Sequence, residues 1–176
     1  MRYVIVDVEA TCWETGTRVE RQEIIEIGAV LLADMEPVDE FARFIKPTNE
    51  PILSDFCKQL TSITQADVDA AAHYPDVFRA FVAWAGAEPF TLVSWGAYDL
   101  RQFRADCDKH GMTLPESFEN HINLKKQFAR QRDIKPCGMA RALQLAGIPL
   151  EGTHHRGIDD ARNIAKIARL VLPGTP

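Results

Sequence analysis

Two acidic residues, Asp7 and Glu9, stand one residue apart at the end of an apolar stretch near the start of the chain. Side chains of a β-strand alternate between its two faces, so both carboxylates are predicted to lie on the same face. Two such charges repel each other and raise each other's pKa unless a cation lies between them. Because hard divalent metal ions prefer carboxylate oxygens, the pair indicates a metal site. The alternative is a pair of ordinary polar residues at the end of a strand.

A third acid, Asp99, follows an apolar segment over 90–95 that predicts a buried strand, and it stands at the start of a predicted helix over about 98–110. Functional groups of open α/β sheets gather at such strand ends. In the helix, Asp99 shares a stripe with Phe103 and Cys107, at steps of four residues, and is therefore expected to face inward. The alternative role for this acid is to cap the helix or to complement its dipole.

The segment 154–160 contains the spacing His-x-x-x-x-Asp twice, as His154 with Asp159 and as His155 with Asp160. Helix phase separates the two pairs, because Asp160 lies on the apolar face of a predicted final helix and Asp159 lies on the polar face. We therefore predict that Asp160 joins the other acids, that His155 lies over the metal site and titrates near neutral pH, and that His154 is a surface residue. The apolar face consists of Ala161, Ile164, Ala165, Ala168 and Val171, and the polar face of Arg162, Asn163 and Lys166.

Strand and helix patterns along the chain predict the elements that position these side chains. Three early strands with short connections imply an antiparallel start to the sheet, and the later strands alternate with helices, as in a mixed α/β sheet flanked by helices. The predicted strands are 2–9, 23–33, 38–46, 90–95 and a short one near 119–124, and the predicted helices are 53–60, 64–71, one from Pro75 to Gly86, 98–110, 137–146 and 157–172.

Length and composition set further bounds on the chain. Its 176 residues, 46% of them hydrophobic, fit one globular domain over 1–176. The apolar stretches are too short to span a bilayer and the start of the chain lacks the pattern of a signal peptide, so we expect a cytoplasmic protein with no membrane partner. The four cysteines are widely scattered, which favours core thiols over a zinc site or a disulfide framework.

Charge is unevenly distributed along the chain. The net charge is −5, but the segment 125–141 carries +5 and the remainder −10. An acidic body with one basic flank suits an enzyme whose carboxylates hold metal ions while a neighbouring edge meets phosphates. The alternative is a solvated helix face.

Taken together, the four acids in this order, with a histidine five residues before the last, resemble the DEDDh group of 3′–5′ exonucleases. Three motifs are similar to its ERI-like branch, which includes the exonuclease acting on histone mRNA ends: Asp-Val-Glu-Ala-Thr-Cys over 7–12, Trp-Gly-Ala-Tyr-Asp over 95–99 and Ile-Asn-Leu-Lys-Lys over 122–126. The resemblance extends from Tyr3 through the last helix. One departure is Tyr98, where some members have tryptophan.

The resemblance implies a ribonuclease H-like α/β fold, with three antiparallel N-terminal strands followed by parallel strands. It implies that Asp7, Glu9, Asp99 and Asp160 bind two Mg²⁺ or Mn²⁺ ions, about 3.5–4 Å apart in such sites. Asp7 would bridge both ions, Glu9 and Asp160 would hold the nucleophilic water, and Asp99 would support the second ion. His155 would act as general base and, with Glu9, form the catalytic pair. Nucleoside 5′-monophosphates would be released.

Substrate contacts are expected beside the metal acids. The backbone at Ala10 and Thr11 directly follows the acids and could approach the terminal sugar, Trp13 offers a face for a base, and Lys125 and Lys126 offer charges for phosphates. The resemblance favours RNA 3′ ends over DNA as the partner. A single-stranded DNA exonuclease, a catalytically silent nucleic-acid-binding module and a ribonuclease H-like endonuclease remain the alternatives.

Overall fold

Strand β1 (Arg2–Ala10) lies in the middle of a five-stranded mixed sheet with the order β3-β2-β1-β4-β5. On one side, β2 (Ile24–Ala33) and β3 (Glu36–Phe44) pair antiparallel, and on the other, β4 (Thr91–Ser94) and β5 (His121–Asn123) pair in parallel. The structure is a computed structural model and describes residues 1–172. The strand directions confirm the predicted α/β fold with three antiparallel strands followed by parallel ones.

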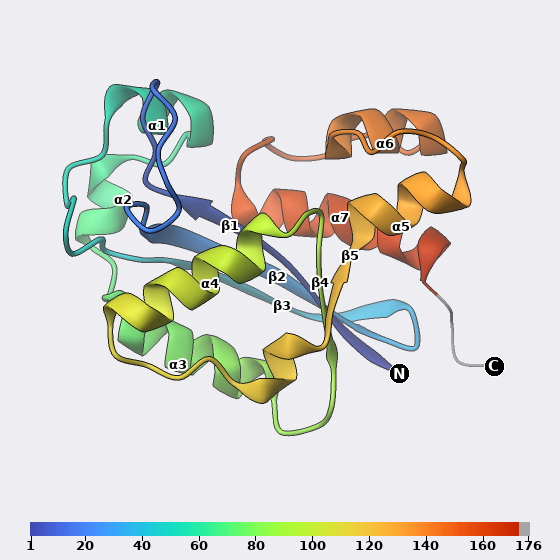
Figure 1. The fold of residues 1–176 in the computed structure, drawn as a ribbon, viewed down its shortest axis with the longest axis horizontal. Coiled ribbons are helices and arrows are strands. Elements are labelled where there is room, and N and C mark those ends of the chain that lie inside the picture. Colours follow the sequence, from blue (N-terminus) through green and yellow to red (C-terminus); the bar gives the residue numbers. More distant parts are fainter. Residues whose placement is uncertain (173–176) are drawn as a thin grey trace.

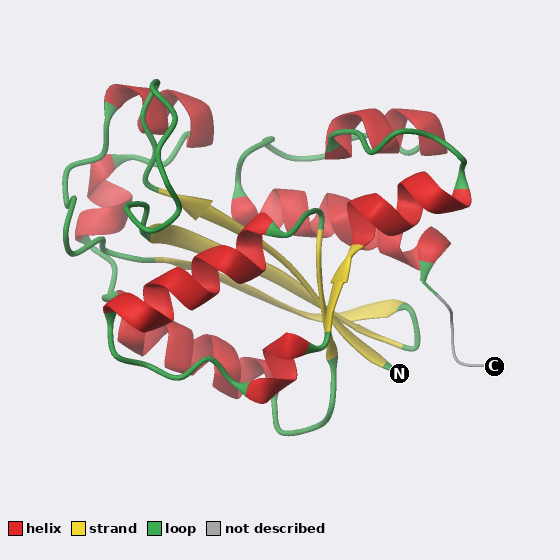
Figure 2. Ribbon diagram, viewed as in Figure 1, coloured by secondary structure: helices red, strands yellow, loops and turns green. Residues whose placement is uncertain are grey.

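Helices cover both faces of this sheet (Figures 1 and 2). Most predicted ranges differ from the observed bounds by a few residues at the ends. The helix α5, which occupies part of the basic segment, was not among the predicted helices. No helix within residues 1–172 is both long and apolar enough to cross a bilayer. The helices are α1 (Asp55–Thr61), α2 (Gln65–Asp69), α3 (Tyr74–Ala85), α4 (Tyr98–Lys109), the short 3-10 helix η1 (Glu116–Glu119), α5 (Leu124–Gln131), α6 (Met139–Ala146) and α7 (Gly157–Val171).

The third strand ends earlier than the prediction of residue 46. It ends at Phe44 because only the Ile45 N–H still bonds β2, at the Ile25 carbonyl, and Lys46 then pairs with His73 in an isolated parallel bridge. This departure leads the chain away from the sheet and into the short helices α1 and α2 (Figure 1).

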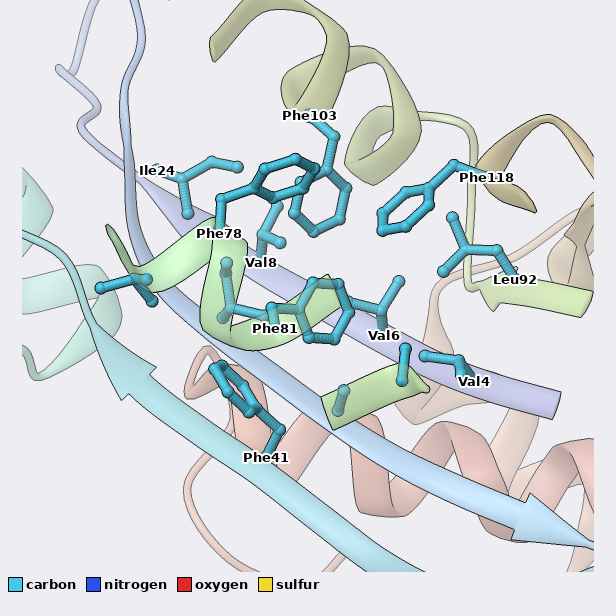
Figure 3. Close-up of a cluster of buried hydrophobic side chains, with 14 of the residues drawn as sticks. Val4, Val6, Val8, Ile24, Phe41, Phe78, Phe81, Leu92, Phe103 and Phe118 are labelled. Carbon is cyan, nitrogen blue, oxygen red and sulfur yellow. The ribbon is translucent and has the colours of Figure 1, made fainter. Parts of the chain in front are cut away.

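The two faces of β1 meet different helical layers. Val4, Val6 and Val8 belong to the aromatic core that α3 and α4 complete with side chains such as Phe81 and Phe103 (Figure 3). Tyr3 and Ile5 belong instead to the core formed with α5, α6 and α7. Because side chains alternate along a strand, Asp7 and Glu9 continue this second face toward the start of α7.

Two glycines allow α7 to begin directly against the sheet. Gly28 of β2 pairs with Asp7 of β1. A Cβ atom on Gly28 would lie 2.0 Å from the backbone carbon of Gly157 and 2.0 Å from the nitrogen of Ile158, so no side chain fits there. The first turn of α7 therefore lies beside Asp7, which brings residue 160 to the end of β1.

Candidate metal and catalytic site

Four carboxylates from three elements line one cavity of about 380 Å³. Asp7 and Glu9 come from the end of β1, Asp99 from the first turn of α4 and Asp160 from the first turn of α7. Ligand oxygens of Asp7, Glu9 and Asp160 all lie within 4.8 Å of one another. The structure thus brings together the four acids that the sequence singled out.

Asp99 is buried and connects α4 to the central strand. Its Oδ1 accepts a hydrogen bond of 3.1 Å from the backbone N–H of Val8. Phe103 and Cys107 on the same stripe are also buried, which confirms the predicted inward face of this helix. Burial raises the pKa of Asp99, while the Val8 N–H and the nearby charge of Lys125 oppose that rise.

Asp7 and Glu9 are held in an environment that disfavours their charged forms. Burial, followed by the charges of Asp99, Glu9 and Asp160, raises the pKa of Asp7 well above its usual value. Burial, followed by the charges of Asp160 and Glu26, raises the pKa of Glu9 to about 9. Within residues 1–172, no cationic side chain forms an ion pair with Asp7 or Glu9. Closely spaced oxygens without a protein cation fit a divalent metal ion.

His155 and His154 both lie over Asp160, in different ways. The backbone N–H of His155 donates to Oδ2 of Asp160 at 3.0 Å. His154 places its ring Nδ1 2.9 Å from the same oxygen, and the two imidazole rings stack with centroids 4.0 Å apart. The prediction that His154 is only a surface residue is therefore wrong, because its ring, although 41% exposed, contacts Asp160.

His155 has the features expected of a proton acceptor. Its ring is half-buried at the cavity, and its backbone has φ of +64°, a left-handed conformation that directs the loop into α7. Burial and the neighbouring His154 lower the pKa of His155, while Asp160 opposes this shift. A lowered pKa keeps the imidazole neutral at physiological pH, which is the form that accepts a proton.

Glu26 is a buried acid of the site that the sequence analysis did not identify. It lies on β2 opposite Glu9. Its carboxylate accepts hydrogen bonds from the Gly157 N–H at 3.0 Å and from the Arg156 guanidinium at 3.2 and 3.3 Å. Glu26 thus binds the first turn of α7 to the sheet. An acid inside the apolar run of β2 was the available sequence signal.

The helix phase of α7 separates its two aspartates as predicted, with one exception on the polar face. Asp160 is 4% exposed, whereas Asp159 points away and accepts hydrogen bonds from the Thr153 N–H and the Arg162 guanidinium. Asn163, predicted to lie on the polar face, is fully buried. Its side chain bonds both backbone groups of Glu151, which fixes the loop before His154.

Of the residues predicted to contact the substrate, only some lie at the cavity of the four acids. Lys125 lines it, whereas Lys126 lines a neighbouring groove beside α5. Ala10 and Thr11 lie just beyond the cavity, and their carbonyls already accept hydrogen bonds from Cys57 and Gln22.

Trp13 lies in a separate hollow rather than at the four acids. The guanidinium of Arg21 lies 4.5 Å from the centroid of the Trp13 ring and covers one face of it. A base could stack only on the face that Arg21 leaves open.

Known proteins resemble this chain in sequence. The profile of a family described as Exonuclease matches residues 4–168. ERI1 exoribonuclease 2 of Xenopus laevis is 33% identical over 196 residues, which cover 97% of this chain and 28% of that protein. The human 3′-5′ exoribonuclease 1 is 31% identical over 179 residues, covering 96% of this chain and 51% of that protein. The chain thus spans roughly a quarter to a half of the length of these relatives.

Solved structures resemble the fold closely. The nuclease domain of 3′hExo, a DEDDh family member bound to rAMP, has a TM-score of 0.91 at 31% identity, with 97% of this chain and 91% of that chain covered. A 3′-exonuclease in a structure of 3′-end-specific recognition of histone mRNA stem-loop has a TM-score of 0.90 at 29% identity, with 96% and 62% covered. The cavity, the sequence matches and these structures agree, and the chain belongs to the DEDDh 3′–5′ exonuclease family, in its ERI-like branch.

Proposed function

We propose that this protein is a metal-dependent 3′–5′ exonuclease that hydrolyses RNA 3′ ends and releases nucleoside 5′-monophosphates. The observation that carries this proposal is the convergence of Asp7, Glu9, Asp99 and Asp160 on one cavity, with His155 beside them. A merely structural role gives no reason to gather four acids whose charges oppose one another.

The carboxylates supply the ligand set for two divalent ions, Mg²⁺ or Mn²⁺, which both bind carboxylate oxygens. Ions bound there would neutralise charge on the scissile phosphate and lower the pKa of the attacking water. Asp7 and Glu9 offer ligand oxygens on one face of β1, Asp160 faces them from α7, and Asp99 closes the set from α4.

The proton of the attacking water passes to the neutral imidazole of His155 in this proposal. The hydrogen bond from its backbone N–H to Asp160 holds the residue beside the acids. His154 contacts Asp160 through its ring, so its role is to orient that carboxylate. Lys125 reaches the cavity from α5 and places a positive charge where a phosphate enters.

RNA is the proposed substrate because relatives with more than 30% identity are exoribonucleases. The test compares 5′-labelled RNA and DNA strands of the same sequence, with Mg²⁺ or Mn²⁺, and includes a circular RNA. We expect mononucleotide release from linear RNA, slower release from DNA and none from the circle. Equal or faster cleavage of DNA would contradict the RNA assignment, and cleavage of the circle would contradict the exonuclease assignment.

Metal binding is tested separately from activity. Titration of the wild-type protein with Mn²⁺ in a calorimeter, without nucleic acid, should give a binding signal that Asp7→Asn removes. Unchanged binding by this variant would contradict the proposed ligand set.

A further inference from the structure

A groove of about 500 Å³ lies beside α5 and is separate from the cavity of the four acids. Its lining residues come from α5 and from β5, the edge strand of the sheet. We call it the α5 groove, and its lining residues are Ile122, Asn123, Lys126, Gln127, Arg130 and Gln131.

The two cations of the α5 groove are not used within the protein. Lys126 and Arg130 stand one helical turn apart, so both side chains face the same groove. Within residues 1–172, neither side chain forms an ion pair or a hydrogen bond, and no acidic residue lines the groove. By contrast, Arg162 and Arg169 of α7 each pair with a glutamate of β3. Two unpaired cations that share one groove can attract an anionic ligand, although the protein as a whole carries a net charge of −5.

Consecutive residues of α5 line the cavity of the four acids and the α5 groove. Lys125, the residue before Lys126, lines that cavity, and its backbone N–H donates to the Trp95 carbonyl at 3.0 Å. From Lys125 to Arg130 the helix advances about 7–8 Å. A strand whose end lies at the acids would therefore meet Lys126 and then Arg130 as it leaves the cavity.

The groove walls are firmly held, which suits a binding surface. The Asn123 side chain accepts the Lys126 backbone N–H at 3.1 Å and fixes the start of α5. Gln131 donates to the Val171 carbonyl at 2.8 Å and ties the other end of α5 to α7. Between them, Phe128 is buried in the core.

We propose that the α5 groove binds the sugar–phosphate backbone of the nucleic-acid strand on the 5′ side of the nucleotide held at the four acids. The inference rests on the proposed function for the direction of the strand. The contacts are ionic and directed at phosphates, so binding is independent of base sequence and weakens with salt.

The test measures the length dependence of binding and cleavage with the double variant Lys126→Gln, Arg130→Gln. A fluorescent single-stranded RNA 12-mer is titrated in EDTA at several salt concentrations. The slope of log affinity against log salt concentration should fall in magnitude by about 1.4, since each lost phosphate contact removes about 0.7 for single strands. With Mn²⁺, the ratio of kcat/KM for the 12-mer to that for a dinucleotide should fall about tenfold, which corresponds to about 1.4 kcal/mol shared between two exposed charge contacts.

The matched control is the double variant Lys135→Gln, Arg141→Gln, which removes the same charge from the same basic segment but outside the α5 groove. Its slope and its ratio should equal those of the wild type. The proposal is overturned if the groove variant keeps the wild-type slope and ratio, or if the control variant changes them equally. A third outcome separates the two proposals. If the groove variant shows the predicted change in slope but the wild type cleaves no RNA, the groove is supported and the exonuclease assignment is contradicted.

Discussion

At the level of single residues, the carboxylates of the site repel one another and are poorly solvated. Asp7 and Glu9 are gathered with other acids and have no cationic partner within residues 1–172. Their pKa values are raised, so the folded protein binds protons that the unfolded chain releases. These two groups therefore contribute most to the stability of the metal-free protein at low pH, and their contribution is lost as the pH rises through the folded-state pKa, which is about 9 for Glu9. A divalent ion bound as proposed would offset this loss.

We predict that Asp7→Asn stabilises the metal-free protein while abolishing activity, because the amide removes a half-buried charge from the acid cluster. In EDTA at pH 8 the melting temperature should rise, by about 2–4 °C for each kcal/mol gained in a domain of this size. At pH 5 the gain should be smaller, because the carboxylates of the wild type are then more protonated. Glu20→Gln, at an exposed acid, is the control. A lower melting temperature at pH 8 would contradict this account.

Glu26 is expected to position the segment that carries His155 and Asp160. Glu26→Gln leaves the shape of the side chain but weakens its bonds to Arg156 and Gly157, and hydrogen bonds to a charged group contribute about 1.5–3 kcal/mol each. We expect faster amide hydrogen exchange over 155–160 and a lower kcat, with KM for RNA little changed.

The control for Glu26 is Glu40→Gln. Glu40 also ties α7 to the sheet, but its partner is Arg162 and this ion pair is exposed, whereas Glu26 is buried against Arg156 and Gly157. Equal exchange rates over 155–160 in both variants would show that Glu26 does not position this segment.

At the scale of elements, the approach of α7 to β2 decides where Asp160 lies. Gly28→Ala would place a methyl group into the backbone of Gly157. Overpacking of this kind typically costs about 1–3 kcal/mol, and a backbone clash allows little relief. We predict a loss of unfolding free energy of at least this size, together with weaker Mn²⁺ binding in calorimetry. Gly16→Ala, where the added Cβ meets nothing within 4 Å, should leave both quantities unchanged.

Elements with a clear period were predictable from the sequence, and contacts between elements were not. The alternation in β1 placed Asp7 and Glu9 on one face, and the phase of α7 separated Asp160 from Asp159. Asn163 was predicted on the polar face, but it is buried because its amide bonds the backbone of Glu151. The periodicity of the helix carries no information about contacts with that loop. The ring contact of His154 and the bonds of Glu26 likewise depend on segments that are distant in sequence.

At the scale of the whole molecule, the sheet directs residues far apart in the chain to one edge. The parallel strands β1 and β4 end at the same side of the sheet, so Glu9 and the helix that carries Asp99 meet there. α7 then crosses this end and adds Asp160, while α5 places Lys125 at the cavity and its other cations along the α5 groove. The acidic body thus carries the proposed metal ligands, and the basic flank lies where, in this proposal, a strand would leave the site.

Cleavage of a 5′-labelled single-stranded RNA with Mn²⁺ or Mg²⁺ tests whether the four acids and His155 form an exonuclease site. The reactions compare the wild type, with and without EDTA, to His155→Ala and His154→Ala. We predict a ladder that shortens from the 3′ end, is abolished by EDTA and falls by about 10²–10⁴-fold on loss of His155, the usual contribution of a general base. Loss of His154 should slow cleavage far less. No cleavage with either metal ion while the RNA remains bound would contradict the account.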